Sequence, residues 1–263
     1  MENFNTKASE VSMEETSPVN IVMDNVEAEP VAENTNEASP ETEDEIETEN
    51  YVTLGDKSCY IYFNLQFTGL MRNADLISIG LVDGDGRTFY AEFTDYDLQK
   101  CDGWVFTNVI KKLKKPETVL EGNDWTMTGT RKEIRTQLFF WLDRFASENK
   151  PVQFVGDVAH LSFTLLLDLI IGDPDVSFTA LPKWISPALL DLNQDLGNML
   201  FRKKPVDVSK EDFDKNYVPN ANAFQIDRVD CAKSLMEDIG DYHNALDQAK
   251  IIKALHLYIW NEK

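Results

Sequence analysis

Hydrophobic and polar residues alternate most clearly between residues 60 and 92, where three short apolar runs follow one another. The runs are CYIYFNLQF, LISIGLV and TFYAEF, and the turn sequence DGDGR joins the second run to the third. Alternation rich in β-branched and aromatic residues is typical of half-buried strands, and Asp-Gly pairs favour hairpin turns. The pattern predicts an antiparallel three-stranded meander that opens a mixed sheet.

A helical period replaces this alternation from residue 97 onward. Apolar residues recur every three or four positions between Asp97 and Pro116, which predicts one capped helix whose paired lysines stand at a solvated C-terminal end. A second helix is predicted in TRKEIRTQLFFWLDRFASENK, where Thr130 and Glu133 form a capping box. Its buried face is expected to consist of Ile134, Leu138, Trp141, Leu142 and Phe145.

Strands and helices alternate in the following part of the chain. PVQFVG predicts a buried strand and DVAHLSFTLLLDLIIGD a helix, and this order favours an α/β layer with parallel strands after the antiparallel opening. LPKWISPALLDLNQDLGNMLF predicts one or two helices interrupted at Pro187, and residues 202–228 predict loop with a short helix from Ser209. Two helices separated near Gly240 are expected at the end, the second from about His243 to Asn261.

Charge divides the chain into two parts. Residues 1–50 hold 15 Asp and Glu and one Lys, and so carry two thirds of the formal charge of −21. They have few aromatics and no sustained period, so they cannot bury enough apolar surface to offset the entropy of ordering. We expect 1–50 to be a disordered acidic tail and 51–263 to be the folded domain. The tail is interpreted as a solvated extension; the alternative is an arm that binds a partner and repels nucleic acid.

The cysteines and the hydropathy limit the compartment and the membrane association that can be expected. Cys59, Cys101 and Cys231 are widely spaced and odd in number, which argues against a disulfide framework or a zinc site and predicts a reducing, cytoplasmic compartment. The apolar run 19–23 is too short for a membrane span and lacks the basic flank of a signal peptide, so no membrane partner is expected. Residues 51–263 carry no strongly basic stripe of the kind that nucleic-acid binding usually requires.

Three ordered motifs carry a family resemblance that covers about residues 56–262. YFNLQFTGL with the meander, DVAHLSF and HNALDQAK resemble the DEDD 3'-5' exonucleases of the histidine subclass (DEDDh). The chain is most similar to small bacterial and phage exoribonucleases that begin Asp-x-Glu-Phe-Thr-Gly-Leu. The resemblance implies a ribonuclease-H-like fold, a mixed sheet flanked by helices, and a bacterial or phage host.

The family chemistry uses four carboxylates that hold two divalent metal ions, and the resemblance places neutral residues at all four ligand positions. These degenerate metal-ligand positions are Asn64, Gln66, Ser162 and Gln248. Mg²⁺ prefers hard, anionic oxygen ligands, so neutral side chains are poor replacements and no metal cofactor is expected. The general base of the subclass is matched by His243, which is interpreted as a vestigial base and, without metals, as a locally satisfied residue at the helix start.

Neighbouring carboxylates do not rebuild the site in this interpretation. Asp247 is one position before Gln248 and is expected to point elsewhere on its helix, and Asp168 is expected to face outward. Asp157 is interpreted as an N-cap. The loss of all four ligands and the use of serine for one of them indicate native substitutions, although the amides are also replacements that an experimenter would choose.

Ligand binding without cleavage stays open. The resemblance implies that Phe67, Thr68, Gly69 and Leu70 form the segment that contacts a terminal nucleotide. The leading hypothesis is therefore a pseudoenzyme that binds an RNA 3' end, a nucleotide or a protein partner, the last through the acidic tail. One alternative is an active 3'-5' exoribonuclease with an atypical Mg²⁺ or Mn²⁺ site. The other is a structural protein with a vestigial cleft.

Overall fold

The computed structural model describes residues 59–71, 73–147, 151–172, 180–202, 209 and 219–261. All of these residues belong to one compact unit, residues 50–263. The tail expected over residues 1–50 lies outside the described residues. So does the short helix expected to begin at Ser209, apart from Ser209 itself.

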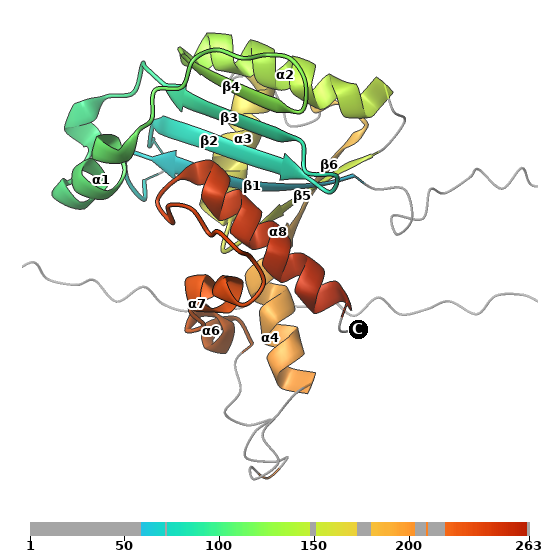
Figure 1. The fold of residues 1–263 in the computed structure, drawn as a ribbon. Helices are drawn as coiled ribbons and strands as arrows, with labels where there is room; N and C mark the ends of the chain where they lie inside the picture. The colour runs from blue at the N-terminus through green and yellow to red at the C-terminus, as the bar shows by residue number, and fades with distance from the viewer. Residues whose placement is uncertain are drawn as a thin grey trace, which may run out of the picture. The chain divides into compact units, whose positions relative to one another are not determined.

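A six-stranded mixed sheet with the order β4-β3-β2-β1-β5-β6 forms the centre of the fold (Figure 1). The strands are β1 Cys59–Phe67, β2 Leu76–Asp83, β3 Thr88–Phe93, β4 Asp124–Gly129, β5 Val152–Gly156 and β6 Ile185–Asp191. Strands β1, β2 and β3 form the predicted antiparallel meander, whereas β5 runs parallel to β1, β6 to β5, and β4 to β3. The predicted α/β fold is confirmed, and it is consistent with a ribonuclease-H-like architecture.

Helices cover both faces of this sheet. Helices α2 Arg131–Ser147 and α3 His160–Ile171 share one hydrophobic core with the sheet, and α8 Ala245–Asn261 and the start of α4 Leu192–Arg202 share the other. Side chains alternate between the faces of a strand. In β1, Phe63 and Leu65 therefore pack toward α2 and α3, and Tyr62 packs toward α8.

The predicted capping box and apolar stripe of α2 are confirmed. The Thr130 backbone N–H donates to Glu133 Oε2 at 2.8 Å, and the Glu133 backbone N–H donates to Thr130 Oγ1 at 3.4 Å. All five predicted core residues of this helix are buried. Local sequence signals thus determine this helix and its orientation.

The single helix predicted after residue 97 is wrong. Three short segments replace it: the 3-10 turn η1 Leu98–Lys100, α1 Gly103–Asn108 and the 3-10 turn η2 Ile110–Lys112. Asp97 caps the first as expected, but the Asp102 carboxylate accepts from the Val105 N–H at 2.8 Å and starts a new helix. Lys111 and Lys112 form the exposed end of η2, as expected of a solvated helix end, and Lys112 lies 3.3 Å from Asp241, in the loop before α8.

The helix predicted on the N-terminal side of Pro187 is also wrong, because residues 185–191 form strand β6. This strand pairs with β5 at the edge of the sheet, and the register shifts opposite the Val152–Phe154 stretch. Proline is tolerated at edge strands and bulges because no ladder hydrogen bond is required there. Pairing with β5, rather than the local pattern, therefore decides the structure of this segment.

The C-terminal region contains α6 Pro219–Phe224 and α7 Arg228–Lys233 before α8. The two helices expected on either side of Gly240 are confirmed, and Gly240 itself adopts a left-handed φ of 63°. Helix α6 replaces the end of the predicted loop. Pro219 stands at its first position, where a fixed φ and a missing N–H are favourable.

Candidate functional site

Three amide side chains meet between β1 and α8. Asn64 and Gln66 project from β1 toward α8, and Gln248 lies in the first turn of that helix. Asn64 Nδ2 and Gln66 Nε2 both donate to Gln248 Oε1, the latter at 3.0 Å. We call Asn64, Gln66 and Gln248 the amide cluster. All three are half-buried, so the group faces the surface on one side.

The amide cluster forms because α8 lies directly on the sheet at Gly80. Gly80 pairs with Asn64 across the β1–β2 ladder. A Cβ atom on Gly80 would lie only 2.2 Å from the backbone nitrogen of Leu246. A residue without a side chain is therefore required there, and its absence of bulk brings Gln248 within reach of β1.

A buried polar network fixes the start of α8 above the sheet. The Asn244 side-chain oxygen accepts from the Leu246 and Asp247 N–H groups at 3.0 and 3.2 Å, so Asn244 caps the helix. Its Nδ2 donates to the Tyr90 hydroxyl at 3.0 Å, and Tyr90 donates to Glu92 at 2.6 Å. Burial, and then the hydrogen bond and charge of Glu92, raise the pKa of Tyr90, so this phenol stays a neutral donor.

The Glu92 carboxylate is satisfied although it is buried. Besides the Tyr90 hydroxyl, it accepts from the Lys114 and Lys115 N–H groups at 2.7 and 2.8 Å. Buried charges require such partners. The lysine segment is thereby attached to the sheet beside the start of α8.

His243 lies in the loop that precedes α8. Its backbone N–H donates to Asp241 Oδ1 at 2.9 Å, and its ring packs edge-on against Trp104 at a centroid distance of 5.3 Å. Burial opposes ionisation of Asp241, but the His243 N–H and the nearby Lys112 lower its pKa overall. His243 is thus held through its backbone and through ring packing against the exposed Trp104, and its interpretation as a vestigial base stays a prediction.

Tyr242 borders both Gln248 of the amide cluster and the charged Asp157. Its hydroxyl hydrogen-bonds with the Gln248 side chain. Burial, followed by the charge of Asp157, raises the pKa of Tyr242. The amide cluster is therefore bordered by a neutral hydroxyl as well as by the sheet.

The N-cap role predicted for Asp157 is wrong. Helix α3 begins at His160 after Ala159, which makes no side-chain capping bond, and Asp157 instead binds Arg228 through both carboxylate oxygens at 2.9 and 3.0 Å. Arg228 has five N–H donors. The other three reach Asn193 Oδ1 and the carbonyls of residues 223 and 226. Sequence analysis missed Arg228 because its partner lies 71 positions away.

The remaining candidate positions are not part of the amide cluster. Ser162 is half-buried in the first turn of α3, and among the described residues no hydrogen bond joins it to the three amides. Asp168 is exposed, as expected. Asp247 also points elsewhere, as expected, because its carboxylate accepts from the Asp241 N–H at 3.0 Å and lies 3.7 Å from Lys114.

The segment Phe67–Leu70 combines fixed and exposed residues. Thr68 is buried and closes the β1–β2 loop through two 3.0 Å bonds with the Asp75 backbone, one to its N–H and one to its carbonyl. Phe67 packs against the core, Gly69 is half-buried, and the Leu70 side chain is 88% exposed. An exposed apolar side chain thus follows the buried Thr68.

The donor atoms gathered here do not fit a pair of divalent metal ions. The amide cluster and Ser162 supply only neutral oxygens and nitrogens, whereas Mg²⁺ sites rely on carboxylates. Within the described ranges, no group of three or more His, Cys, Asp or Glu residues could hold a metal ion. Polar binding is the chemistry that this arrangement offers.

Comparison with known proteins gives a partial similarity. No family model matches the chain. A stretch of 77 residues is 35% identical to 3'-5' exoribonuclease Rv2179c of Mycobacterium tuberculosis strain ATCC 25618 / H37Rv, and equally to 3'-5' exoribonuclease MT2234.1 of strain CDC 1551 / Oshkosh. The match covers 29% of this chain and 42% of each relative, so the chain spans about two fifths of their length. The similarity supports an exonuclease-like domain.

One further property concerns membranes. None of the helices in the part of the chain that the structure describes combines the length and apolar character needed to cross a bilayer.

Proposed function

We propose that this chain is a DEDDh-type 3'-5' exoribonuclease-like domain that has lost metal-dependent cleavage and binds the 3' end of a single-stranded RNA without hydrolysing it. The observation that carries the proposal is the amide cluster. Two donors, Asn64 Nδ2 and Gln66 Nε2, converge on the single oxygen Gln248 Oε1.

The lack of charge in the amide cluster argues against cleavage. Carboxylates placed as closely as these amides would repel one another and would require cations between them. The amides hydrogen-bond to one another instead, because an amide carries both donor and acceptor atoms. The amide cluster therefore needs no metal ions for neutralisation, and without them the attacking water of a two-metal mechanism would have nothing to activate it.

The surroundings of the amide cluster support RNA binding. The Trp104 side chain is 57% exposed beside His243, and Tyr242 is partly exposed beside Gln248. Exposed aromatic rings stack on unpaired bases. Two exposed lysines lie near the start of α8: Lys112 is 3.3 Å from Asp241, and Lys114 is 3.7 Å from Asp247. Both can also contact a phosphate. We expect modest affinity that falls with salt, since the neighbouring carboxylates offset much of this positive charge.

The test uses the full chain and a short single-stranded RNA labelled at its 5' end, with binding followed by anisotropy and integrity by gel. We expect binding in both EDTA and Mg²⁺, with the RNA intact. Trp104→Ala should weaken binding about tenfold. Phe140→Ala, at a similarly exposed aromatic residue on α2, is the matched control and should not.

Two results would overturn the proposal. Shortening of the RNA by the native chain with Mn²⁺, abolished by EDTA, would identify an active exoribonuclease. No binding in either condition would indicate a structural protein with a vestigial cleft.

A further inference from the structure

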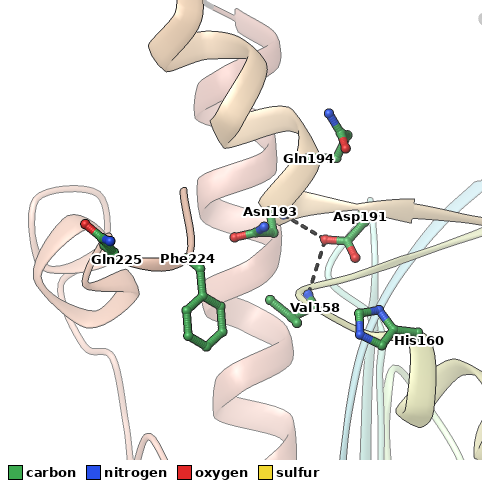
Figure 2. A pocket seen from close by; sticks show the side chains of 7 residues that line it. All are labelled: Val158, His160, Asp191, Asn193, Gln194, Phe224 and Gln225. Carbon is green, nitrogen blue, oxygen red and sulfur yellow. Dashed lines mark hydrogen bonds between the residues drawn. The ribbon is translucent and has the colours of Figure 1, made fainter. Parts of the chain in front are cut away.

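A pocket separate from the amide cluster lies at the carboxyl ends of β5 and β6. Its volume is about 590 Å³, within the usual range for small-molecule sites, and Figure 2 shows the side chains around it. The lining residues are Val158, His160, Asp191, Asn193, Gln194, Phe224 and Gln225. We call this the strand-end pocket. It contains no residue of the amide cluster, so the inference below does not depend on whether the domain cleaves RNA.

The place of the pocket in the fold favours ligand binding. Strands β5 and β6 are parallel and end at Gly156 and Asp191, so both carboxyl ends open toward the pocket. Ligands of open α/β sheets bind outside the carboxyl ends of parallel strands. The strand-end pocket occupies that position.

One strained backbone position lies at the same point. Val158 has a φ of 48°, in the left-handed region that β-branched residues rarely adopt. Its N–H donates to Asp191 Oδ1 at 3.2 Å, and the preceding Asp157 is held by Arg228. Residues kept in such conformations cluster at ligand sites, because the surrounding contacts must maintain them. The strained turn places the Val158 side chain on the pocket wall (Figure 2).

The lining defines the chemistry of the ligand. Among the described residues that line the pocket there is no Lys or Arg, and Asp191 is the carboxylate present, so a phosphate group is disfavoured. Phe224 is 66% exposed, and in the view of Figure 2 the Val158 side chain lies between the Phe224 ring and the His160 imidazole. Gln194 and Gln225 also line the pocket, and their amides are directed away from Asp191 in the view of Figure 2. An aromatic face with uncharged polar groups suits a flat, neutral, hydrogen-bonding ring.

Asp191 supplies a directional contact. The hydrogen bonds that reach its carboxylate from the Val158 and Asn193 N–H groups, at 3.2 and 2.9 Å, both end on Oδ1. Among the described residues none is directed to Oδ2, so this oxygen can accept from a ligand. A carboxylate oxygen accepts hydrogen bonds and cannot donate them, which selects an amino group over a carbonyl.

We propose that the strand-end pocket binds an amino-bearing nucleobase, that of adenosine, cytidine or guanosine, with Phe224 stacked on the ring and Asp191 Oδ2 accepting from the exocyclic amino group. The shared chemistry is the base, which either a free nucleoside or an RNA strand can supply.

The experiment compares pairs of ligands that differ at the amino group. Binding of adenosine against inosine, and of cytidine against uridine, is measured on the full chain by ligand-observed NMR titration. We expect the amino-bearing partner to bind about tenfold more tightly in each pair, as for a hydrogen bond to a charged group. Asp191→Asn should remove this preference while its remaining oxygen still accepts from the Val158 and Asn193 N–H groups.

Phe224→Ala should weaken every nucleoside that binds, whereas Phe140→Ala, at an exposed ring on α2, should weaken none. Circular dichroism spectra and thermal midpoints establish that each variant is folded. If Asp191→Asn fails to fold, the paired-ligand comparison in the native chain and the Phe224→Ala variant still test the proposal.

The source of the base is distinguished by two further titrations. Tighter binding of adenosine than of adenosine 5'-monophosphate indicates a free nucleoside, and a short RNA that displaces adenosine indicates a base within a strand. If only the RNA binds and Phe224→Ala weakens it, the strand is the ligand. Equal affinity within both pairs, no effect of Phe224→Ala, or no binding of any of these ligands would overturn the proposal.

Discussion

Gln66 donates a 3.0 Å hydrogen bond to the side-chain oxygen of Gln248, which lies 182 positions further along the chain. The contact joins β1 to α8 without any charged group. It predicts that the native fold is indifferent to divalent metal ions, because nothing in the amide cluster needs them for neutralisation.

The first prediction follows from this neutrality. The native chain should have the same thermal midpoint in EDTA and in excess Mn²⁺. The variant with Asn64→Asp, Gln66→Glu, Ser162→Asp and Gln248→Asp should be less stable in EDTA, since its carboxylates repel, and should recover with Mn²⁺. At a Mn²⁺ concentration of about 100 times the dissociation constant, the recovery would be about 2.7 kcal/mol. A native midpoint that rises with Mn²⁺ to the same extent as that of the variant would contradict this neutrality.

The second prediction concerns the contact of α8 with the sheet. Gly80→Ala should destabilise the domain by about 1–3 kcal/mol or more, because its Cβ would overlap the backbone of Leu246. Gly84→Ala is the matched control, since no atom lies within 4 Å of a Cβ built there. Urea unfolding measures both. Equal stability of the two variants would show that α8 does not rest on Gly80.

A third prediction tests the Asp157–Arg228 pair. Arg228 is 7% exposed, so Arg228→Ala would leave Asp157 as an uncompensated, largely buried charge and should cost about 3–5 kcal/mol. Lys233→Ala, which breaks the exposed Lys233–Asp230 pair of the same helix, should leave the unfolding midpoint almost unchanged. Similar midpoints for the two variants would refute a structural role for the buried pair.

The fourth prediction is a pH dependence at Asp75. Burial opposes its ionisation, but the hydrogen bonds from Lys100 and from the Asp97 N–H outweigh burial and lower its pKa. A carboxyl whose pKa is lowered by folding stabilises the fold above the unfolded pKa and loses that contribution as the pH falls through the folded pKa.

The native chain should therefore be more stable than Asp75→Asn at about pH 6, and the difference should shrink as the pH falls below about 3.9, the pKa of an unfolded Asp. Thermal midpoints across this range measure the difference, and Asp168→Asn, at an exposed position, serves as the control. A difference that stays constant down to the lowest pH would exclude ionisation of Asp75 as its cause.

Much of the fold could be predicted because its signals are local. The apolar runs of β1, β2 and β3, and the capping box of α2, arise from neighbouring residues and form the predicted elements. The expectation of half-buried strands is wrong for β2 and β3, which are buried at every position because helices cover both faces of the sheet. Strand β6 could not be predicted from ISPALLD, because an edge strand with a proline gains its structure from pairing with β5. The prediction of a single helix after residue 97 was wrong because Asp102 starts a second helix within the same apolar period.

The candidate site was likewise predicted only in part. The resemblance assigned Asn64, Gln66 and Gln248 to one site, and the structure brings these three side chains into contact. The surrounding supports were missed because each joins distant segments: Asn244 reaches Tyr90 on β3, and Arg228 reaches Asp157 after β5. Tertiary packing creates such pairs, and the sequence near each residue contains no sign of them.

The loss of cleavage is tested most directly by restoring the carboxylates. The full native chain and the variant with Asn64→Asp, Gln66→Glu, Ser162→Asp and Gln248→Asp are incubated with end-labelled single-stranded RNA and Mn²⁺. We predict that the native chain leaves the RNA intact and that the variant shortens it from the 3' end, except in EDTA. Shortening by the native chain, abolished by EDTA, would contradict the account, and an inert variant would contradict the assignment of the four positions.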